Sequence, residues 1–186
     1  MKVVCFLSNG FEEIEAITPV DVLRRAGIDC EFYSINEIVV EGAHGMKITA
    51  DHLLTNDDDL SNVDMIILPG GMPGAQHLAD NEKVQEIIKE FHRNNKYIAA
   101  ICAAPALALG KSGIIEGKNV TCYPGMEDNI PNSNYIDEVV VQDGNIITSQ
   151  GPSTALPFAF KLLKVLKGDS RSLEYGMLWN KIGGEY

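Results

Sequence analysis

A cysteine stands at the junction between an apparent strand and an apparent helix in Lys96–Pro105, and this junction constrains the fold most. The run Tyr97–Ile101 is apolar, as is typical of a buried strand. Cys102 follows at once, and after it come two alanines, Pro105 and apolar residues at helical spacing. Proline is tolerated in a first helical turn, where its missing N–H has no partner to lose. The segment therefore predicts strand, sharp turn and helix, with a nucleophile-type side chain at the turn.

Hydrolases expose their nucleophile at such a turn, usually within the pattern G-x-S-x-G. Here the positions two before and two after the cysteine are Ala100 and Ala104, which are small enough for close packing of strand and helix. A helix N-terminus at Cys102 would favour the thiolate, so we expect a thiol pKa below its ordinary value. The alternative is a buried structural cysteine, because free cysteine often behaves as a small apolar residue.

Strand-like and helix-like segments alternate along the chain, and several of the strands are apolar throughout. This pattern predicts an α/β fold with a mostly parallel sheet covered by helices on both faces. Active sites in such sheets lie at the carboxyl ends of the strands, where Cys102 also lies. Strands are expected at Lys2–Leu7, Cys30–Ile35, Ile38–Val40, Met46–Thr49, Asp64–Leu68, Tyr97–Ile101, Val120–Cys122, Ile136–Val141 and Asn145–Thr148, and helices at Glu12–Ala26, Glu82–His92 and Pro152–Leu166.

Length and composition indicate one domain. The chain has 186 residues, and we expect a single domain over 1–168 followed by an extension over 169–186. Leu173, Met177 and Leu178 predict a helix in this extension, with one apolar stripe packed on the domain. The net charge of −11, without a basic cluster, argues against nucleic acid or an anionic membrane as a partner.

The cysteines and the N-terminus bear on the compartment. The four cysteines are widely spaced and match neither a disulfide framework nor a zinc ligand set. No histidine pair has metal-ligand spacing, so no metal is expected. The apolar start is too short for a signal peptide, and no run is long enough to cross a membrane. A reducing cytoplasm fits best.

Two other segments are expected at the same edge of the sheet. Glu15 lies one turn into the first helix and either faces a neighbouring strand end or is solvated, and spacing alone favours solvation. Gly70 and Gly71 follow a strand and allow the backbone to approach a ligand closely. Together with the N–H of Ala103 they could form an oxyanion hole, and an ordinary Pro-Gly turn is the alternative.

Several motifs, taken together, resemble the DJ-one/ThiJ branch of the ThiJ/PfpI superfamily. Each motif alone is weak, but their order along nearly the whole domain is specific. They are Gly10-Phe-Glu-Glu-Ile-Glu15, Pro19-Val-Asp-Val-Leu-Arg-Arg-Ala-Gly27, Leu68-Pro-Gly-Gly71, Ala99-Ala-Ile-Cys-Ala-Ala-Pro105 and Thr148-Ser-Gln-Gly-Pro-Ser-Thr154.

The resemblance implies a flavodoxin-like three-layer α/β sandwich that forms a homodimer and needs no cofactor, with Arg24 and Arg25 as candidate interface residues. By motif position, Cys102 corresponds to the nucleophile and oxidation-sensitive cysteine, and Glu15 to the buried acid beside it. Gly70, Gly71 and Ala103 correspond to the backbone donors. A thiolate and a carboxylate in contact cannot both stay charged cheaply, so this pair should titrate as a unit.

The chain departs from its relatives at two positions. Several relatives carry a histidine before a proline near the cysteine, where this chain has Tyr123. Peptidases of the superfamily carry histidine directly after the cysteine, where this chain has Ala103, and this argues against peptidase or amidase activity. Tyr123 and His44, which lies in the loop Gly42–Gly45, remain auxiliary candidates.

The resemblance implies two functions that use the same residues. The first is glyoxalase or deglycase chemistry on small reactive aldehydes, in which Cys102 forms a hemithioacetal and Glu15 moves a proton. The second is redox sensing or stress protection, in which Cys102 oxidises to a sulfinate. Sequence alone does not separate these functions, whereas turnover would.

Overall fold

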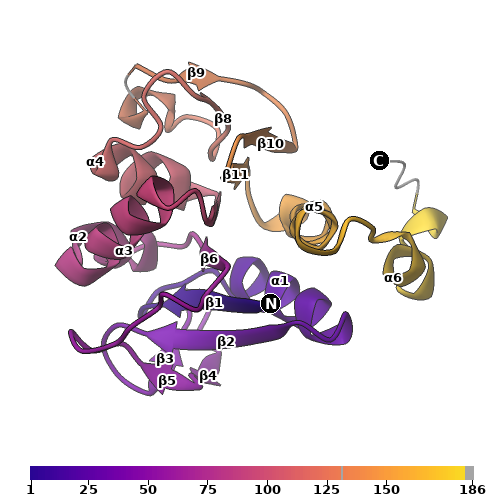
Figure 1. Ribbon diagram of the computed structural model, residues 1–186, viewed down its shortest axis with the longest axis horizontal. Coiled ribbons are helices and arrows are strands. Elements are labelled where there is room, and N and C mark those ends of the chain that lie inside the picture. The colour runs from indigo at the N-terminus through magenta and orange to yellow at the C-terminus, as the bar shows by residue number, and fades with distance from the viewer. Residues whose placement is uncertain (131, 183–186) are drawn as a thin grey trace.

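The computed structural model describes residues 1–130 and 132–182, and its centre is a seven-stranded sheet (Figure 1). The strand order is β10-β11-β7-β6-β1-β2-β5, and every neighbouring pair is parallel except β10 and β11. The strands are β1 (Lys2–Leu7), β2 (Asp29–Ser34), β5 (His52–Leu53), β6 (Met65–Leu68), β7 (Tyr97–Ile101), β10 (Val140–Asp143) and β11 (Ile146–Ser149). The predicted mostly parallel sheet is confirmed.

Helices cover both faces of this sheet, which completes the three layers (Figure 1). Helices α1 (Glu13–Arg25) and α5 (Ala155–Lys167) pack together on one face. Helices α2 (Gly74–Asp80) and α3 (Glu82–Arg93) belong to the other, where the short α4 (Gly110–Ser112) contacts α3. Acidic side chains in the first turn of α1 and arginines in its last turn match the helix dipole.

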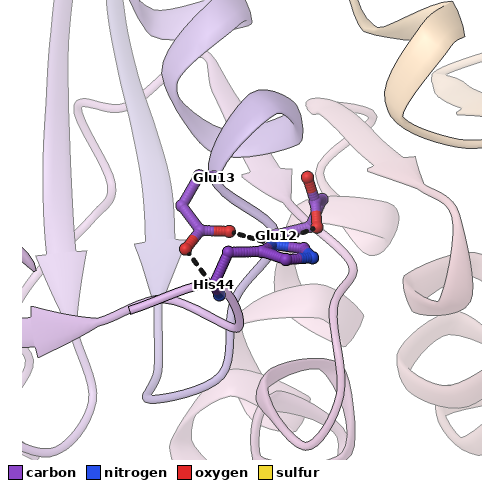
Figure 2. A group of neighbouring side chains, drawn as sticks. All are labelled: Glu12, Glu13 and His44. Carbon is purple, nitrogen blue, oxygen red and sulfur yellow. Dashed lines mark hydrogen bonds and ion pairs between the residues drawn. The ribbon is translucent and has the colours of Figure 1, made fainter. Parts of the chain in front are cut away.

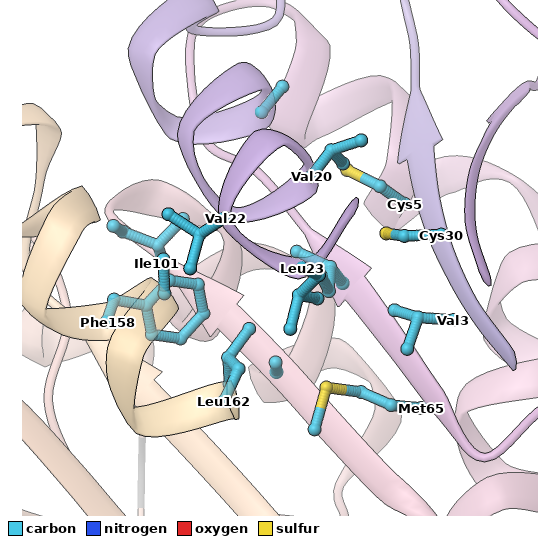
Figure 3. Packing of buried hydrophobic residues seen from close by; sticks show 14 of the residues in the cluster. Val3, Cys5, Val20, Val22, Leu23, Cys30, Met65, Ile101, Phe158 and Leu162 are labelled. Carbon is cyan, nitrogen blue, oxygen red and sulfur yellow. The ribbon is translucent and has the colours of Figure 1, made fainter. Parts of the chain in front are cut away.

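Alternation along β1 explains why its residues are apolar throughout. Val3, Cys5 and Leu7 belong to the core under α1 and α5, whereas Val4 and Phe6 belong to the core on the opposite face. Successive side chains of a strand point to opposite faces, so a strand covered on both sides needs apolar residues at every position. Figure 3 shows the first of these cores, where residues of β1 meet residues of α1 and α5.

Smaller elements lie around the sheet, and some of them differ from the expectation. The hairpin of β3 (Val39–Glu41) and β4 (Lys47–Thr49) forms as expected. The expected strand Val120–Cys122 is instead β8 (Asn119–Val120), and Cys122 lies just beyond it. The short strand β9 (Asn134–Tyr135) pairs with β8 and not with the main sheet. It ends before the expected strand Ile136–Val141 begins. Of that segment, only the end continues into β10.

Short helical turns complete the chain. A π-helical turn, Pro105–Leu109, follows the cysteine, and 3-10 turns occupy Glu127–Asn129, Pro152–Thr154 and Trp179–Lys181. The expected helix Pro152–Leu166 is therefore a 3-10 turn followed by α5. No helix among the described residues is long and apolar enough to span a membrane.

The C-terminal extension contains helix α6 (Arg171–Gly176), which lies beyond α5 at the periphery of the molecule (Figure 1). Leu173 and Met177 pack against the core, as expected for an apolar stripe. Leu178 is 61% exposed, so its place in that stripe is a wrong prediction. Its φ of +62° turns the chain away from the helix. The last part of the predicted extension, 183–186, lies outside the described residues.

Candidate functional site

Cys102 lies where β7 ends, in a backbone conformation that cysteine rarely adopts. Its φ is +64°, in the left-handed region. Two backbone hydrogen bonds hold this turn: the N–H of Cys102 donates to the carbonyl of Ser149 at 2.9 Å, and the N–H of Tyr123 donates to the carbonyl of Cys102 at 2.8 Å. Such a conformation costs about 1–3 kcal/mol and persists where the surroundings enforce it, commonly at functional sites. The predicted sharp turn at the cysteine is present.

Glu15 projects from α1 into the same place and is completely buried. Its Oε2 accepts a hydrogen bond of 2.9 Å from the N–H of Gly70. Its Oε1 is buried and has no hydrogen-bond partner among the described residues. The buried position implied by the family resemblance is the one observed, whereas the solvated position favoured by spacing alone is wrong.

Gly70 lies directly against the two reactive side chains, Glu15 and Cys102. A Cβ atom at this position would lie 2.6 Å from Oε2 of Glu15, 2.7 Å from Cβ of Cys102 and 3.0 Å from its Sγ. Contacts below 3.0 Å are essentially never seen for real Cβ atoms, so only glycine fits here without displacing the pair. The absence of a side chain at Gly70 therefore lets thiol and carboxyl come together.

Burial determines the titration of both groups. Burial raises the pKa of Glu15 from 4.5 to about 7, while interactions with the Cys102 thiol and the Gly70 N–H act in the opposite direction. Burial, followed by the Glu15 carboxylate, raises the pKa of Cys102 from 9.0 to about 12, and hydrogen bonds from the backbone of Gly71 and Ala103 lower it. The expected low thiol pKa is thus contradicted. Burial of the thiol, followed by the charge of Glu15, outweighs the backbone donors at the sulfur.

The two groups nevertheless favour thiolate under one condition. When Glu15 carries the proton, the repulsive charge disappears, while the N–H groups of Gly71 and Ala103 remain directed at the sulfur. One proton shared by the pair gives a neutral acid beside a thiolate, or a carboxylate beside a thiol. This arrangement supplies a nucleophile, an acid/base group and backbone donors within one site.

An open pocket of about 520 Å³ gives access to the pair. Among its lining residues are both auxiliary candidates, His44 and Tyr123, and also Gly71. Tyr123 is 48% exposed at the pocket wall, and its ring lies close to Gly151. The structure therefore brings together Cys102, Glu15 and the auxiliary candidates at one pocket. Gly70 differs from the expected backbone donor to the sulfur, because its N–H donates to Glu15 instead.

A second polar cluster, missed by the sequence analysis, borders this pocket and consists of Glu12, Glu13 and His44 (Figure 2). His44 Nδ1 lies 2.8 Å from Oε2 of Glu13 and 3.3 Å from Oε2 of Glu12. The two glutamates look like ordinary acids at the start of α1, and His44 is far away in sequence. No local signal links these residues, because the contact forms only when the hairpin β3–β4 folds onto α1.

The three side chains of this cluster offer metal-ligand atoms that all lie within 4.8 Å of one another. Three protein ligands are too few to close a structural zinc site, which normally has four. Moreover, Glu13 already accepts hydrogen bonds from the N–H of His44 and the N–H of Met46. Burial raises the pKa of Glu13, but the contact with the imidazole and the backbone hydrogen bonds outweigh it and lower the pKa, and the same contact raises the pKa of His44. An ion pair thus accounts for the contacts of the cluster.

Comparison with known proteins places this chain in a family. The model of the DJ-1/PfpI family matches residues 1–165. "Protein DJ-1 homolog B" of Arabidopsis thaliana is 39% identical over 93% of this chain, which spans only 40% of that relative's length. "Glutathione-independent glyoxalase DJ-1" of Schizosaccharomyces pombe is 33% identical, with 88% of this chain and 90% of that protein covered. The structure "Toxoplasma gondii DJ-1, oxidized" superposes with a TM-score of 0.89 at 34% identity, covering 95% of this chain and 97% of that one. The chain belongs to the DJ-1/PfpI family.

Proposed function

We propose that this protein is a cysteine-dependent, cofactor-free enzyme that acts on small reactive aldehydes, with glyoxalase or deglycase chemistry. The observation that carries this proposal is the contact of the Cys102 thiol with the buried carboxyl of Glu15 at a pocket with backbone donors. The relative in fission yeast that is named a glutathione-independent glyoxalase supports it.

The first step on methylglyoxal is addition of the Cys102 thiolate to the aldehyde carbon. The new sulfur–carbon bond gives a hemithioacetal, and the N–H groups of Gly71 and Ala103 stabilise the oxyanion before it takes a proton. Glu15 then removes the proton from the former aldehyde carbon and returns a proton to the neighbouring carbon, so that the ketone becomes a hydroxyl. Water cleaves the resulting thioester, which releases lactate and regenerates the thiol.

The pKa of Glu15 suits this role. An acid/base group works best when its pKa lies near the operating pH, and burial raises that of Glu15 to about 7. Glu15 is also close enough to Cys102 for its charge to raise the thiol pKa, so it is placed to act on an adduct at the sulfur. Tyr123 and His44 line the pocket as auxiliary groups that can contact the bound aldehyde.

The test compares methylglyoxal turnover in the wild type, Cys102→Ala, Glu15→Gln and Cys122→Ala. Cys102→Ala should be inactive, and Cys122→Ala, which removes another buried free cysteine, serves as the control. Glu15→Gln keeps a hydrogen-bond donor but cannot shuttle a proton, so kcat should fall at least about 100-fold. The hemithioacetal adduct should still be trapped on Cys102. Near-wild-type turnover in Glu15→Gln would exclude Glu15 as the base.

A second candidate function is redox sensing by the same cysteine. It is supported by the backbone donors at the sulfur, which suit a small oxyanion such as a sulfinate, and by the similarity to a solved structure described as oxidized. A wild type that forms sulfinate readily but shows no turnover of methylglyoxal or glyoxal would favour this function over the enzyme.

A further inference from the structure

The pocket in front of Cys102 is bordered by negative groups. Glu12 and Glu13 line it, as does Glu15, whose pKa is about 7, and His44 is its one basic side chain among the described lining residues. When His44 is protonated, it offsets the charge of one of these carboxylates. The pocket therefore keeps a negative character beside the sulfur.

Glu12 and Glu13 form an acidic rim at this pocket, and the fold fixes its position. Glu13 is 1% exposed and receives hydrogen bonds from the backbone of His44 and Met46, which fasten the loop between β3 and β4 to α1. Gly42 of this loop packs so closely on Glu13 that a Cβ there would lie 2.3 Å from Oε1. Burial raises the pKa of Glu13, but the hydrogen bonds from the His44 imidazole and from the backbone outweigh this effect and keep the pKa below its ordinary value, so the carboxylate stays charged at neutral pH.

The charges of the rim affect the pKa of the reactive pair, Glu15 and Cys102. Glu12 is among the groups that raise the pKa of Glu15, which itself interacts with Cys102. Charges act over about 8 Å at physiological ionic strength, and an approaching ligand must pass the rim. His44 is 67% exposed in its side chain, so its charge also faces incoming molecules.

We propose that Glu12 and Glu13, partly offset by His44, select by charge the compounds that reach Cys102, so that uncharged and cationic carbonyl compounds are preferred over anionic ones. As a statement about substrate class, this inference rests on the proposed function. Methylglyoxal and glyoxal would be accepted, whereas glyoxylate would be disfavoured by repulsion from the rim. His44 acts as a specificity-determining residue because its positive charge weakens that repulsion.

The test uses alkylation, which needs no turnover. Iodoacetamide is uncharged and iodoacetate is anionic, and with both the thiolate sulfur forms a bond to carbon as iodide leaves. The ratio of the two rates at Cys102, followed by peptide mass spectrometry, cancels the ionisation of the thiol. Dividing by the same ratio for 2-mercaptoethanol removes the intrinsic difference between the reagents. At pH 6.5 the raised pKa of His44 keeps most of its imidazole protonated.

The wild type should prefer iodoacetamide by about threefold to tenfold after this correction. Glu12→Gln should reduce the preference, and His44→Gln should increase it, because the two substitutions remove opposite charges. Glu86→Gln is the matched control: it removes an exposed carboxylate from α3, on the other face of the sheet, and should leave the ratio unchanged. Salt near 1 M should abolish the preference, since screening then acts within about 3 Å.

Two results would overturn the proposal: a wild-type ratio equal to that of 2-mercaptoethanol, or equal ratios in Glu12→Gln, His44→Gln and the wild type. The salt series needs no variant and tests whether the preference is electrostatic, whereas Glu12→Gln and His44→Gln, which remove opposite charges, assign it to the pocket. A charge preference without any aldehyde turnover would uphold the selective rim and contradict the proposed enzyme. Aldehyde turnover without a charge preference would support the proposed enzyme and contradict the selective rim.

Discussion

The buried carboxyl of Glu15 should cost the protein stability at alkaline pH, and Glu15→Gln should recover it. A carboxyl whose pKa rises from 4.5 to about 7 on folding binds its proton more tightly in the folded state. The corresponding stabilisation is complete below pH 4.5 and is lost as the pH rises through 7. A tenfold change in a proton equilibrium is worth about 1.4 kcal/mol, so the whole effect is about 3 kcal/mol.

Glutamine at position 15 removes this pH dependence of the stability but can keep the hydrogen bonds of the carboxyl. Its amide oxygen can still accept from the N–H of Gly70, and its amide nitrogen can donate to the sulfur of Cys102. Relative to the wild type, Glu15→Gln should therefore gain about 2–3 kcal/mol in free energy of unfolding between pH 5 and pH 8. The exposed Glu86→Gln should show no such gain.

Urea unfolding at pH 5, 6, 7 and 8 measures this difference for the wild type and both variants. The m-values should agree among the three proteins, which establishes that the unfolding transitions are comparable. A difference between Glu15→Gln and the wild type that stays constant over this pH range would refute the reasoning. It would mean that Glu15 does not titrate differently in the folded and unfolded states.

Three further predictions concern the same region and the assembly. Mild peroxide should add two oxygens to Cys102, seen as a sulfinate in peptide spectra, because Gly71 and Ala103 donate to the sulfur; a disulfide with Cys122 would contradict this. Gly70→Ala should lower the kcat for methylglyoxal by about 100-fold, because a Cβ at 2.6 Å from Glu15 would displace Glu15 and Cys102. Gly176→Ala is the control and should keep the wild-type kcat, because nothing lies within 4 Å of a Cβ at that position. Light scattering should give twice the 20.3 kDa mass, and a monomer at micromolar concentration would disprove the homodimer.

Some elements follow from short-range pattern alone. The run Tyr97–Ile101 is a strand because five consecutive apolar or small residues suit burial on both faces, and the turn at Cys102 follows from the small residues around it. The hairpin between β10 and β11 follows from Asp143-Gly144, where glycine adopts a φ of +60°. Arg24, the candidate for an interface, also binds Asp51 and the carbonyl of Cys30 within the chain.

Errors occurred where pairing is decided by distant segments. The strand expected at Ile136–Val141 is shorter and later than expected: β9 pairs with β8 just before this segment, and only Val140 and Val141 pair with β11. Apolar composition identifies a segment that prefers burial, but not the strand beside which it lies. Such choices depend on which surfaces meet when the helices pack.

The sequence by itself determined the α/β alternation, the parallel sheet and the cysteine at a strand end, because these depend on residues close together in the chain. Spacing within the chain favoured a solvated Glu15, and the tertiary structure decided that it is buried. Only the tertiary structure decided that burial of the thiol and the charge of Glu15 raise the thiol pKa when a low one was expected. It also decided that His44 meets Glu13 at the pocket. Burial and electrostatic effects depend on the three-dimensional surroundings of a group, and segments far apart in the sequence supply those surroundings.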